Sequence, residues 1–319
     1  MASNEMAGQV VSRSEPESFH PPDRSAVKGT LLVFAAALLW GSNGLVSSQA
    51  SPGTSALALG AAGMAIGGLL LFATTRGTTR FVSSCSRRDR LHLAVGAVAV
   101  AGFPVFFYPA VARAGVAVPT ALAMGSAPLF AGLLSCFIHR SRPTNRWCVA
   151  TLAAVIGCVT LVLGRPTAGG SSQDDLGMLL AVLAGLFFAT YSFIGSQFIS
   201  RGHASAQVMA AMFGGGGVVA LTVLLFAGVD NLADARGLSI ALYLAGFATF
   251  LAYRLYGSGL RHTGPHVATS LALAEPAVAA MLGVCVLDER LPLLSWLGLA
   301  VLGVGLLWLV YPDRSQRIP

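Results

Sequence analysis

Long apolar stretches, most of them without a charged residue, recur along the chain and restrict what it can fold into. Ten of them are long enough to cross a hydrocarbon core of about 30 Å at roughly 1.5 Å of helix rise per residue. They begin near Val27, Thr54, Leu91, Val116, Trp147, Leu176, Gln207, Leu238, His266 and Leu294. In lipid the backbone of a single span must satisfy its own hydrogen bonds, and the alternation of a membrane barrel is missing. The expected fold class is therefore an all-α integral membrane protein with ten transmembrane helices.

The composition agrees with lipid as the main solvent. The chain of 319 residues is 55% hydrophobic and 10% charged, whereas a soluble domain carries about a quarter charged residues. Its five cysteines lack paired Cys-x-x-Cys spacing, so we expect neither a disulfide framework nor a metal site. The basic residues lack the interleaved aromatic side chains of a nucleic-acid groove. The expected partners are the lipid bilayer and a small-molecule substrate, with no cofactor and no nucleic acid, and the choice between monomer and homodimer stays open.

The distribution of basic residues predicts the orientation. If the N-terminus is cytoplasmic, sixteen of the 20 Lys and Arg residues fall on the cytoplasmic side, as the positive-inside rule requires. Both termini are therefore expected in the cytoplasm. Residues 1–26 are polar and contain three prolines and four acidic residues, so they are expected to form a disordered cytoplasmic tail, and residues 313–319 a second, short one.

The two halves of the chain repeat each other at a fixed offset of 148 residues. The offset holds across four helices without a gap, which indicates an internal repeat. It aligns Met64 with Met212, Gly67 with Gly215, Tyr108 with Tyr256, Arg113 with Arg261, and Pro128 with Pro276. Each repeat contains five predicted spans, an odd number, so the second copy enters the membrane from the opposite face. Inverted repeats of this kind are typical of secondary transporters.

The motifs resemble those of the EamA family within the drug/metabolite transporter superfamily. The second half contains Ala274-Glu275-Pro276, a small-residue helix and the turn Glu289-Arg290-Leu291, while Ala37 to Gly44 (ALLWGSNG) is similar to the first-helix motif. The resemblance assigns residues 27–163 and 175–312 to two five-helix repeats. It implies a multi-pass carrier of the bacterial inner membrane, usually an exporter of amino acids or other small metabolites. Ala127 replaces the first-half counterpart of Glu275, so carboxylate chemistry is confined to the second half.

Glu275 and Arg254 are the only charged residues well inside predicted spans. A charge at the bilayer centre is unfavourable by at least about 2.5 kcal/mol, so each is expected to have a compensating partner. The two lie at similar depths on consecutive spans and could form a buried salt bridge that fixes packing. Alternatively, they could form a substrate or proton site.

Several uncharged residues are candidates for a substrate cavity or for helix motion. An aromatic and a polar side chain lie one turn apart in span 1, and equivalent positions of span 6 carry two aromatics, which would suit an amphipathic metabolite. The cavity candidates are Trp40, Asn43, Tyr191, Tyr108 and Tyr256, and the helix-hinge candidates are Pro128 and Pro276. Packing is the alternative interpretation for the aromatics and for the prolines.

The remaining function classes have little support in the sequence. No HExxH, GxSxG or P-loop pattern occurs, so an enzyme is not expected. A membrane scaffold or sensor would need a soluble output domain or a substantial loop. A secondary transporter is therefore the leading hypothesis. Proton antiport would require a titratable intramembrane group such as Glu275, whereas facilitated diffusion would not, and both stay open.

Overall fold

The computed structural model describes residues 24–47, 49–51, 53–114, 117–139, 144–163, 175–228, 232, 234–288 and 290–310. The two expected tails lie outside these ranges, except that residues 24–26 begin the first helix instead of belonging to a tail.

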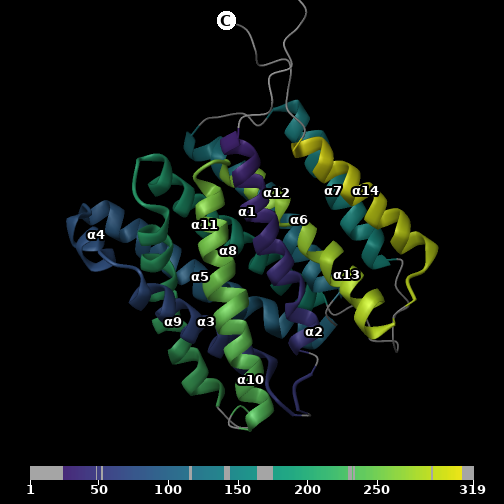
Figure 1. Ribbon diagram of the computed structural model, residues 1–319, viewed down its shortest axis with the longest axis horizontal. Coiled ribbons are helices and arrows are strands. Elements are labelled where there is room, and N and C mark those ends of the chain that lie inside the picture. Colours follow the sequence, from purple (N-terminus) through teal and green to yellow (C-terminus); the bar gives the residue numbers. More distant parts are fainter. Residues whose placement is uncertain are drawn as a thin grey trace, which may run out of the picture.

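All regular elements in the described ranges are helices (Figure 1). In chain order they are α1 (Arg24–Gly41), α2 (Asn43–Ser47), α3 (Ala56–Thr74), α4 (Thr78–Ser84), α5 (Arg87–Ala114), α6 (Ala117–His139), α7 (Asn145–Leu163), α8 (Asp175–Ser200), α9 (Ser205–Ala227), α10 (Ala235–Tyr243), the π-helix η1 (Leu244–Leu251), α11 (Ala252–Leu260), α12 (Pro265–Leu271), α13 (Ala274–Leu287) and α14 (Leu293–Val310).

Eight helical segments in the described part of the chain are long and apolar enough to cross a membrane. Two further apolar helices, Asn145–Leu161 and Leu293–Leu309, are shorter. All ten starts predicted from the sequence lie within four residues of the start of one of these helical segments. An all-helical membrane protein is thereby confirmed.

The helix boundaries follow the internal repeat. Adding 148 to the bounds of α6, 117 and 139, gives 265 and 287, which are the start of α12 and the end of α13. Likewise, the start of α7 at residue 145 maps onto the start of α14 at residue 293, and the start of α5 at residue 87 maps onto that of α10 at residue 235. The repeat seen in the sequence is therefore also a repeat of helix boundaries.

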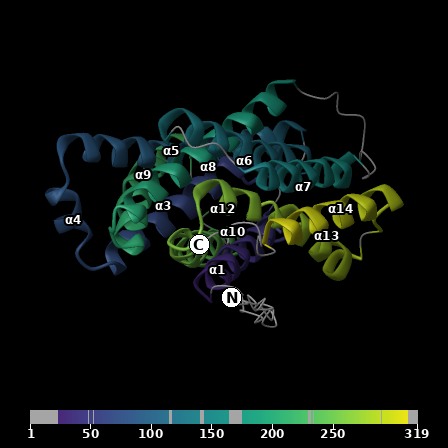
Figure 2. The same cartoon turned by 90° about the horizontal axis from the view of Figure 1, so that it is seen from above.

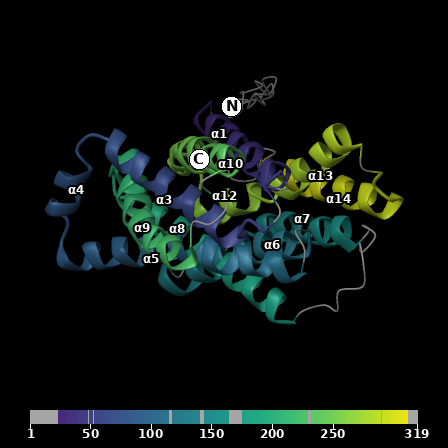
Figure 3. The same cartoon turned by 90° about the horizontal axis from the view of Figure 1, so that it is seen from below.

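The helices form an elongated bundle with different elements at its two ends. Seen from above and from below, α4 lies at one end and α7, α13 and α14 lie at the other (Figure 2, Figure 3). Helices α5, α6 and α8 run along one long side, while α1 and α10 lie on the opposite side (Figure 2, Figure 3). Core residues from both halves of the chain lie between these two sides.

Glycines allow the closest helix approaches, as expected for membrane helices. A Cβ added to Gly157 on α7 would lie 2.3 Å from the backbone nitrogen of Leu302 on α14. On α14, a Cβ added to Gly298 would lie 2.3 Å from the backbone nitrogen of Leu161. These distances are to rigid backbone atoms, so a larger residue would force the two helices apart.

We expect Gly298→Ala to destabilise the protein and Gly303→Ala to have little effect. Both glycines lie on α14, but a Cβ at Gly303 would meet nothing within 4 Å. Loss of close packing at Gly298 should lower the apparent melting temperature of the purified protein, whereas Gly303→Ala should raise it slightly or leave it unchanged because alanine favours helix. Equal shifts for the two variants would contradict the backbone contact between α7 and α14.

Three spans are interrupted, and only the third interruption lies beside a proline named from the sequence as a hinge candidate, Pro276. The first span breaks at Ser42, whose hydroxyl donates to the Leu39 carbonyl at 2.6 Å and lies 2.7 Å from the Tyr243 hydroxyl. The eighth continues from α10 into α11 through the π-helix η1. The ninth breaks between α12 and α13 because Pro276 has no N–H for the Ala272 carbonyl four residues earlier. That carbonyl accepts the Glu275 N–H at 2.9 Å instead.

Candidate functional site

A cavity of about 280 Å³ lies between the two halves of the chain. Residues from α1, α2, α3, α5 and α6 line it together with residues from α8, η1, α11 and α13. It reaches the link between α2 and α3, where Ser47, Ala50 and Thr54 belong to its lining. Ligand pockets usually measure about 300 to 1,000 Å³, so this cavity suits a small molecule.

Contacts join the α2–α3 link, part of which lines the cavity, to the start of α10. The Ser51 hydroxyl donates to Asp234 Oδ2 at 2.8 Å, and Arg236 donates to Gln49 Oε1 at 3.3 Å. The Asp234 Oδ1 atom also accepts the N–H of Gly237 at 2.6 Å, which caps α10. The bond from Ser51, followed by the one from Gly237, holds the pKa of the Asp234 carboxyl below its usual value.

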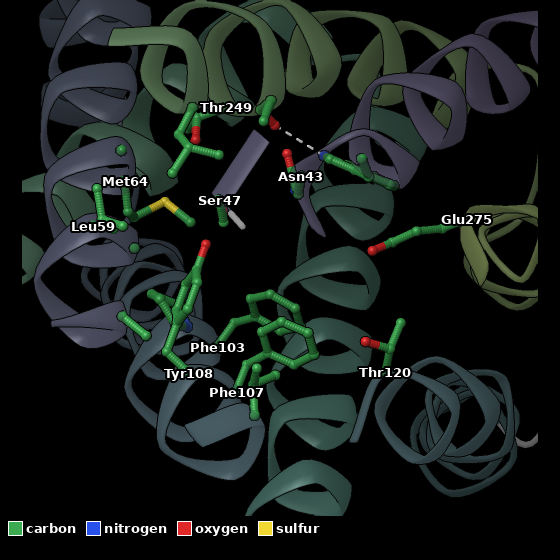
Figure 4. A pocket seen from close by; sticks show the side chains of 18 of the residues that line it. Asn43, Ser47, Leu59, Met64, Phe103, Phe107, Tyr108, Thr120, Thr249 and Glu275 are labelled. Atoms are coloured by element: carbon green, nitrogen blue, oxygen red, sulfur yellow. Dashed lines mark hydrogen bonds between the residues drawn. The ribbon is translucent and has the colours of Figure 1, made fainter. Parts of the chain in front are cut away.

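The structure brings together four of the seven cavity and coupling candidates. Trp40, Asn43, Tyr108 and Glu275 all line the cavity. Figure 4 shows the Glu275 carboxylate pointing into it from α13 and the Tyr108 hydroxyl pointing into it from α5. They come from three separate parts of the chain, namely α1 with α2, α5 and α13, and packing of the two halves places them around one space.

Tyr191 and Tyr256 lie beside the cavity, in a closed aromatic layer. Both side chains are fully buried and absent from the cavity lining. The Tyr191 hydroxyl lies 2.8 Å from that of Tyr253, and the Tyr256 hydroxyl donates to Ser192 Oγ at 2.9 Å. Both bonds join α8 to α11. The layer therefore packs directly behind Phe188 and Tyr253, which line the cavity.

Trp40 connects this layer to the cavity. Its ring centroid lies 5.0 Å from that of Tyr253 and 5.4 Å from that of Tyr256. Its Nε1 donates to the Ala248 carbonyl at 2.9 Å. Ala248 belongs to η1, and such π-helical segments in longer helices often mark functional sites. Trp40 thus fixes α1 against the irregular part of the eighth span.

Arg254 does not meet Glu275. Its side chain is exposed on α11, and its guanidinium lies 5.4 Å from the centroid of the Phe250 ring. It is not part of the cavity lining. Arg254 is six residues from the end of α11, about 9 Å along the axis, so its long side chain can extend toward the interface. The pair expected from the sequence is absent from the described residues.

Pro128 and Pro276, the two hinge candidates, occupy different local structures. Pro276 follows the break between α12 and α13 and directly follows Glu275, whereas α6 passes through Pro128 without interruption. Both residues are buried. Only the second-half proline therefore coincides with an irregular backbone, and it lies beside the cavity carboxylate.

The sequence analysis missed several cavity residues. Phe103 and Phe107 line the cavity, and their rings are stacked with centroids 5.2 Å apart and an interplanar angle of 12°. The signal was present: residues 103–108 read FPVFFY, an aromatic cluster with one-turn spacing. Thr120 and Met64 carry no comparable signal, because isolated threonines and methionines are common in membrane helices.

Known proteins similar to this chain are membrane transporters. The chain is 34% identical over 289 residues to the Uncharacterized transporter YwfM of Bacillus subtilis, covering 90% of this chain and 95% of the relative. It is 28% identical over 287 residues to the Uncharacterized inner membrane transporter YicL of Salmonella typhimurium, covering 86% and 92%. A crystal structure with 19% identity shares the fold, with a TM-score of 0.71 over 88% of this chain and 96% of that one.

The family model of the EamA-like transporter family matches the chain twice. The matches cover residues 27–163 and 175–311, one in each half of the chain. Together with the relatives, this confirms the resemblance drawn from the Glu275-Pro276 and Trp40 motifs. The chain is a multi-pass membrane protein that belongs to the EamA-like transporter family.

Proposed function

We propose that this protein is a secondary transporter that exports amino acids or other small metabolites by alternating access. It would have ten membrane-spanning helices in two inverted repeats, with both termini in the cytoplasm. The observation that carries this proposal is a cavity that is lined by both repeats and lies against the buried layer of Tyr191 and Tyr256.

Contacts between the halves support a two-fold relation of the repeats. A Cβ on Gly67 would lie 2.6 Å from the Ala245 carbonyl, and a Cβ on Gly215 would lie 2.9 Å from Ala97 Cβ. These contacts are exchanged by the offset, because 67 + 148 = 215 and 97 + 148 = 245. Reciprocal contacts are the pattern of two copies related by a two-fold axis. Five spans per copy would place that axis in the membrane plane.

Equivalent residues of the two repeats occupy different environments. Asn43 and Tyr108 line the cavity, while their second-half counterparts, Tyr191 and Tyr256, are buried in the closed aromatic layer. In an inverted-repeat carrier, exchanging the conformations of the halves opens the site to the other side. We infer a second state in which Tyr191 and Tyr256 line the cavity and Asn43 and Tyr108 are packed.

The distribution of basic residues indicates which side of the membrane the cavity faces. With the N-terminus cytoplasmic, the link at residues 49–54 is external, so the cavity is open to the outside. The closed layer would then separate the substrate site from the cytoplasm. For an exporter, this is the state that releases substrate.

Glu275 is the group we assign to proton coupling. Its carboxylate faces the cavity and has no hydrogen bond or ion pair with any described residue. A proton taken up from the external side would displace a substrate that depends on the carboxylate charge. Intramembrane carboxylates in carriers commonly serve such proton exchange.

Reconstitution into liposomes tests the proposal. Purified protein should catalyse counterflow of a labelled metabolite from a panel of amino acids and small amphipathic compounds. A pH gradient that is acidic on the cavity side should accelerate loss of the labelled metabolite from the opposite compartment. Protein-free liposomes are the control. If no member of the panel moves under any gradient, the carrier proposal is wrong. If transport occurs but does not depend on pH, the protein is a carrier that works by facilitated diffusion, and the proposed proton coupling is wrong.

A further inference from the structure

The described lining of the cavity contains an acidic side chain but no basic one. Among the described side chains that line it, Glu275 alone is charged, and none of these is Arg, Lys or His. Arg254, the nearest basic candidate from the sequence, is exposed and lies over Phe250. An ionised group that leaves water requires an opposite charge or several hydrogen bonds. A cation would find its counter-charge in this cavity, whereas a carboxylate would find none.

The other walls suit the apolar or aromatic body of a cation. Six aromatic side chains line the cavity: Trp40, Phe103, Phe107, Tyr108, Phe188 and Tyr253. In Figure 4 the Phe103 and Phe107 rings, Tyr108 and Met64 surround the open centre into which Glu275 points. Aromatic faces attract ammonium groups and also stack on aromatic rings. The arrangement combines a carboxylate with an aromatic cage.

A second polar group in the cavity is also an acceptor. The Oδ1 atom of Asn43 is buried and has no hydrogen-bond partner in the described part of the chain. A buried acceptor without a partner is unfavourable until a donor reaches it. An ammonium or ring N–H would supply that donor, while a carboxylate would add another acceptor. Asn43 and Glu275 therefore favour the same kind of ligand.

From this geometry we propose that the cavity binds aromatic amines in preference to the amino acids that contain the same ring. The proposal rests on the carrier function proposed above and specifies its substrate class. The ammonium lies against Glu275, the ring lies between the aromatic walls, and the small cavity volume limits the body to one ring system. An added carboxylate would enter an aromatic environment without a counter-charge. Anionic metabolites are excluded for the same reason.

Matched ligand pairs test this directly. Tryptamine and tryptophan, tyramine and tyrosine, and phenethylamine and phenylalanine each differ by one carboxylate. Binding to the purified full-length protein is measured by calorimetry, with each amine expected to bind at least about tenfold more tightly than its amino acid. Transport is measured with N,N,N-trimethylphenethylammonium, because its permanent charge prevents leakage as a neutral base.

Variants of Glu275 separate the effect of its charge on binding from any effect on folding. Glu275→Gln should weaken amine binding by about tenfold or more but leave binding of 2-phenylethanol, the uncharged analogue of phenethylamine, unchanged. Unchanged 2-phenylethanol binding also shows that the cavity is intact. Glu275→Asp keeps the charge and should keep the preference for amines.

The outcomes distinguish this inference from the carrier proposal. Amino acids that bind as tightly as their amines, or amine binding that survives Glu275→Gln, would overturn the inference. If amino acids are transported and amines are neither bound nor transported, the carrier stands and the substrate class is wrong. If amines bind with the expected preference but no compound is transported, the substrate class stands and the carrier proposal fails.

Discussion

Replacing Glu275 with glutamine is expected to reduce transport driven by a pH gradient at least about tenfold while leaving the folded yield within about twofold of wild type. Glutamine has nearly the same shape but cannot bind or release a proton. The yield should hold because the carboxylate has no partner among the described residues, so the substitution breaks no internal bond. Removing a charge from an apolar span should, if anything, favour the folded protein in lipid. The measurement is flux in proteoliposomes with and without the gradient, beside size-exclusion yield.

The Arg254 variant provides the comparison. Because Arg254 is exposed on α11 and lies over Phe250, Arg254→Gln and Glu275→Gln should act independently. The double variant should therefore show the sum of the two losses, expressed as free energies, in both yield and flux. A double variant with a higher folded yield than the single variants would mean that the two side chains pair. Their similar depths in consecutive predicted spans first indicated such a pair. If the flux of the Glu275→Gln variant equals that of the wild type, Glu275 takes no part in proton coupling.

The sequence predicted the helices well because the hydrophobic requirement of a span is local. The starts of α6 and α7 lie within two residues of the starts expected from apolar length, and the fixed offset gives the starts of their second-half counterparts, α12 and α14. The π-helix was not predictable in this way. Its Ala248 carbonyl bonds to Trp40, 208 residues away, and a contact between distant residues leaves no trace in local hydropathy. The equivalent part of α5, residues 96–103, is a regular helix, so the internal repeat does not explain the π-helix either.

The candidate site was predictable in its residue types and only partly in its geometry. Glu275 and Trp40 could be selected because charge and indole groups are conspicuous in apolar spans. The sequence could not show which tyrosine of an equivalent pair lines the cavity, because Tyr108 and Tyr256 hold equivalent positions in two similar helices. Their difference arises from the conformation of the whole bundle, open around one and closed around the other.

Trp40→Ala is expected to cause the largest loss of stability among single changes at the cavity. The side chain is 5% exposed and contacts Phe188, Tyr253 and Tyr256. Replacing a buried tryptophan by alanine typically destabilises a core by about 3 to 5 kcal/mol, largely through lost packing; packing contacts also hold membrane helices together. At roughly 2 °C per kcal/mol for a chain of this size, the apparent melting temperature should fall by at least about 6 °C.

Two further variants separate packing from hydrogen bonding and from general effects of tryptophan loss. Trp40→Phe keeps an aromatic ring but removes the donor to the buried Ala248 carbonyl, so it should destabilise the protein by about 1 to 3 kcal/mol. Trp296→Ala removes a tryptophan that is 44% exposed on α14, and it should shift the melting temperature little. Thermal unfolding in one detergent, followed by size exclusion, measures all three. Because Trp40 joins α1 to the π-helix and to the closed aromatic layer, a shift for Trp40→Ala no larger than that for Trp296→Ala would mean that this junction does not hold the two repeats together.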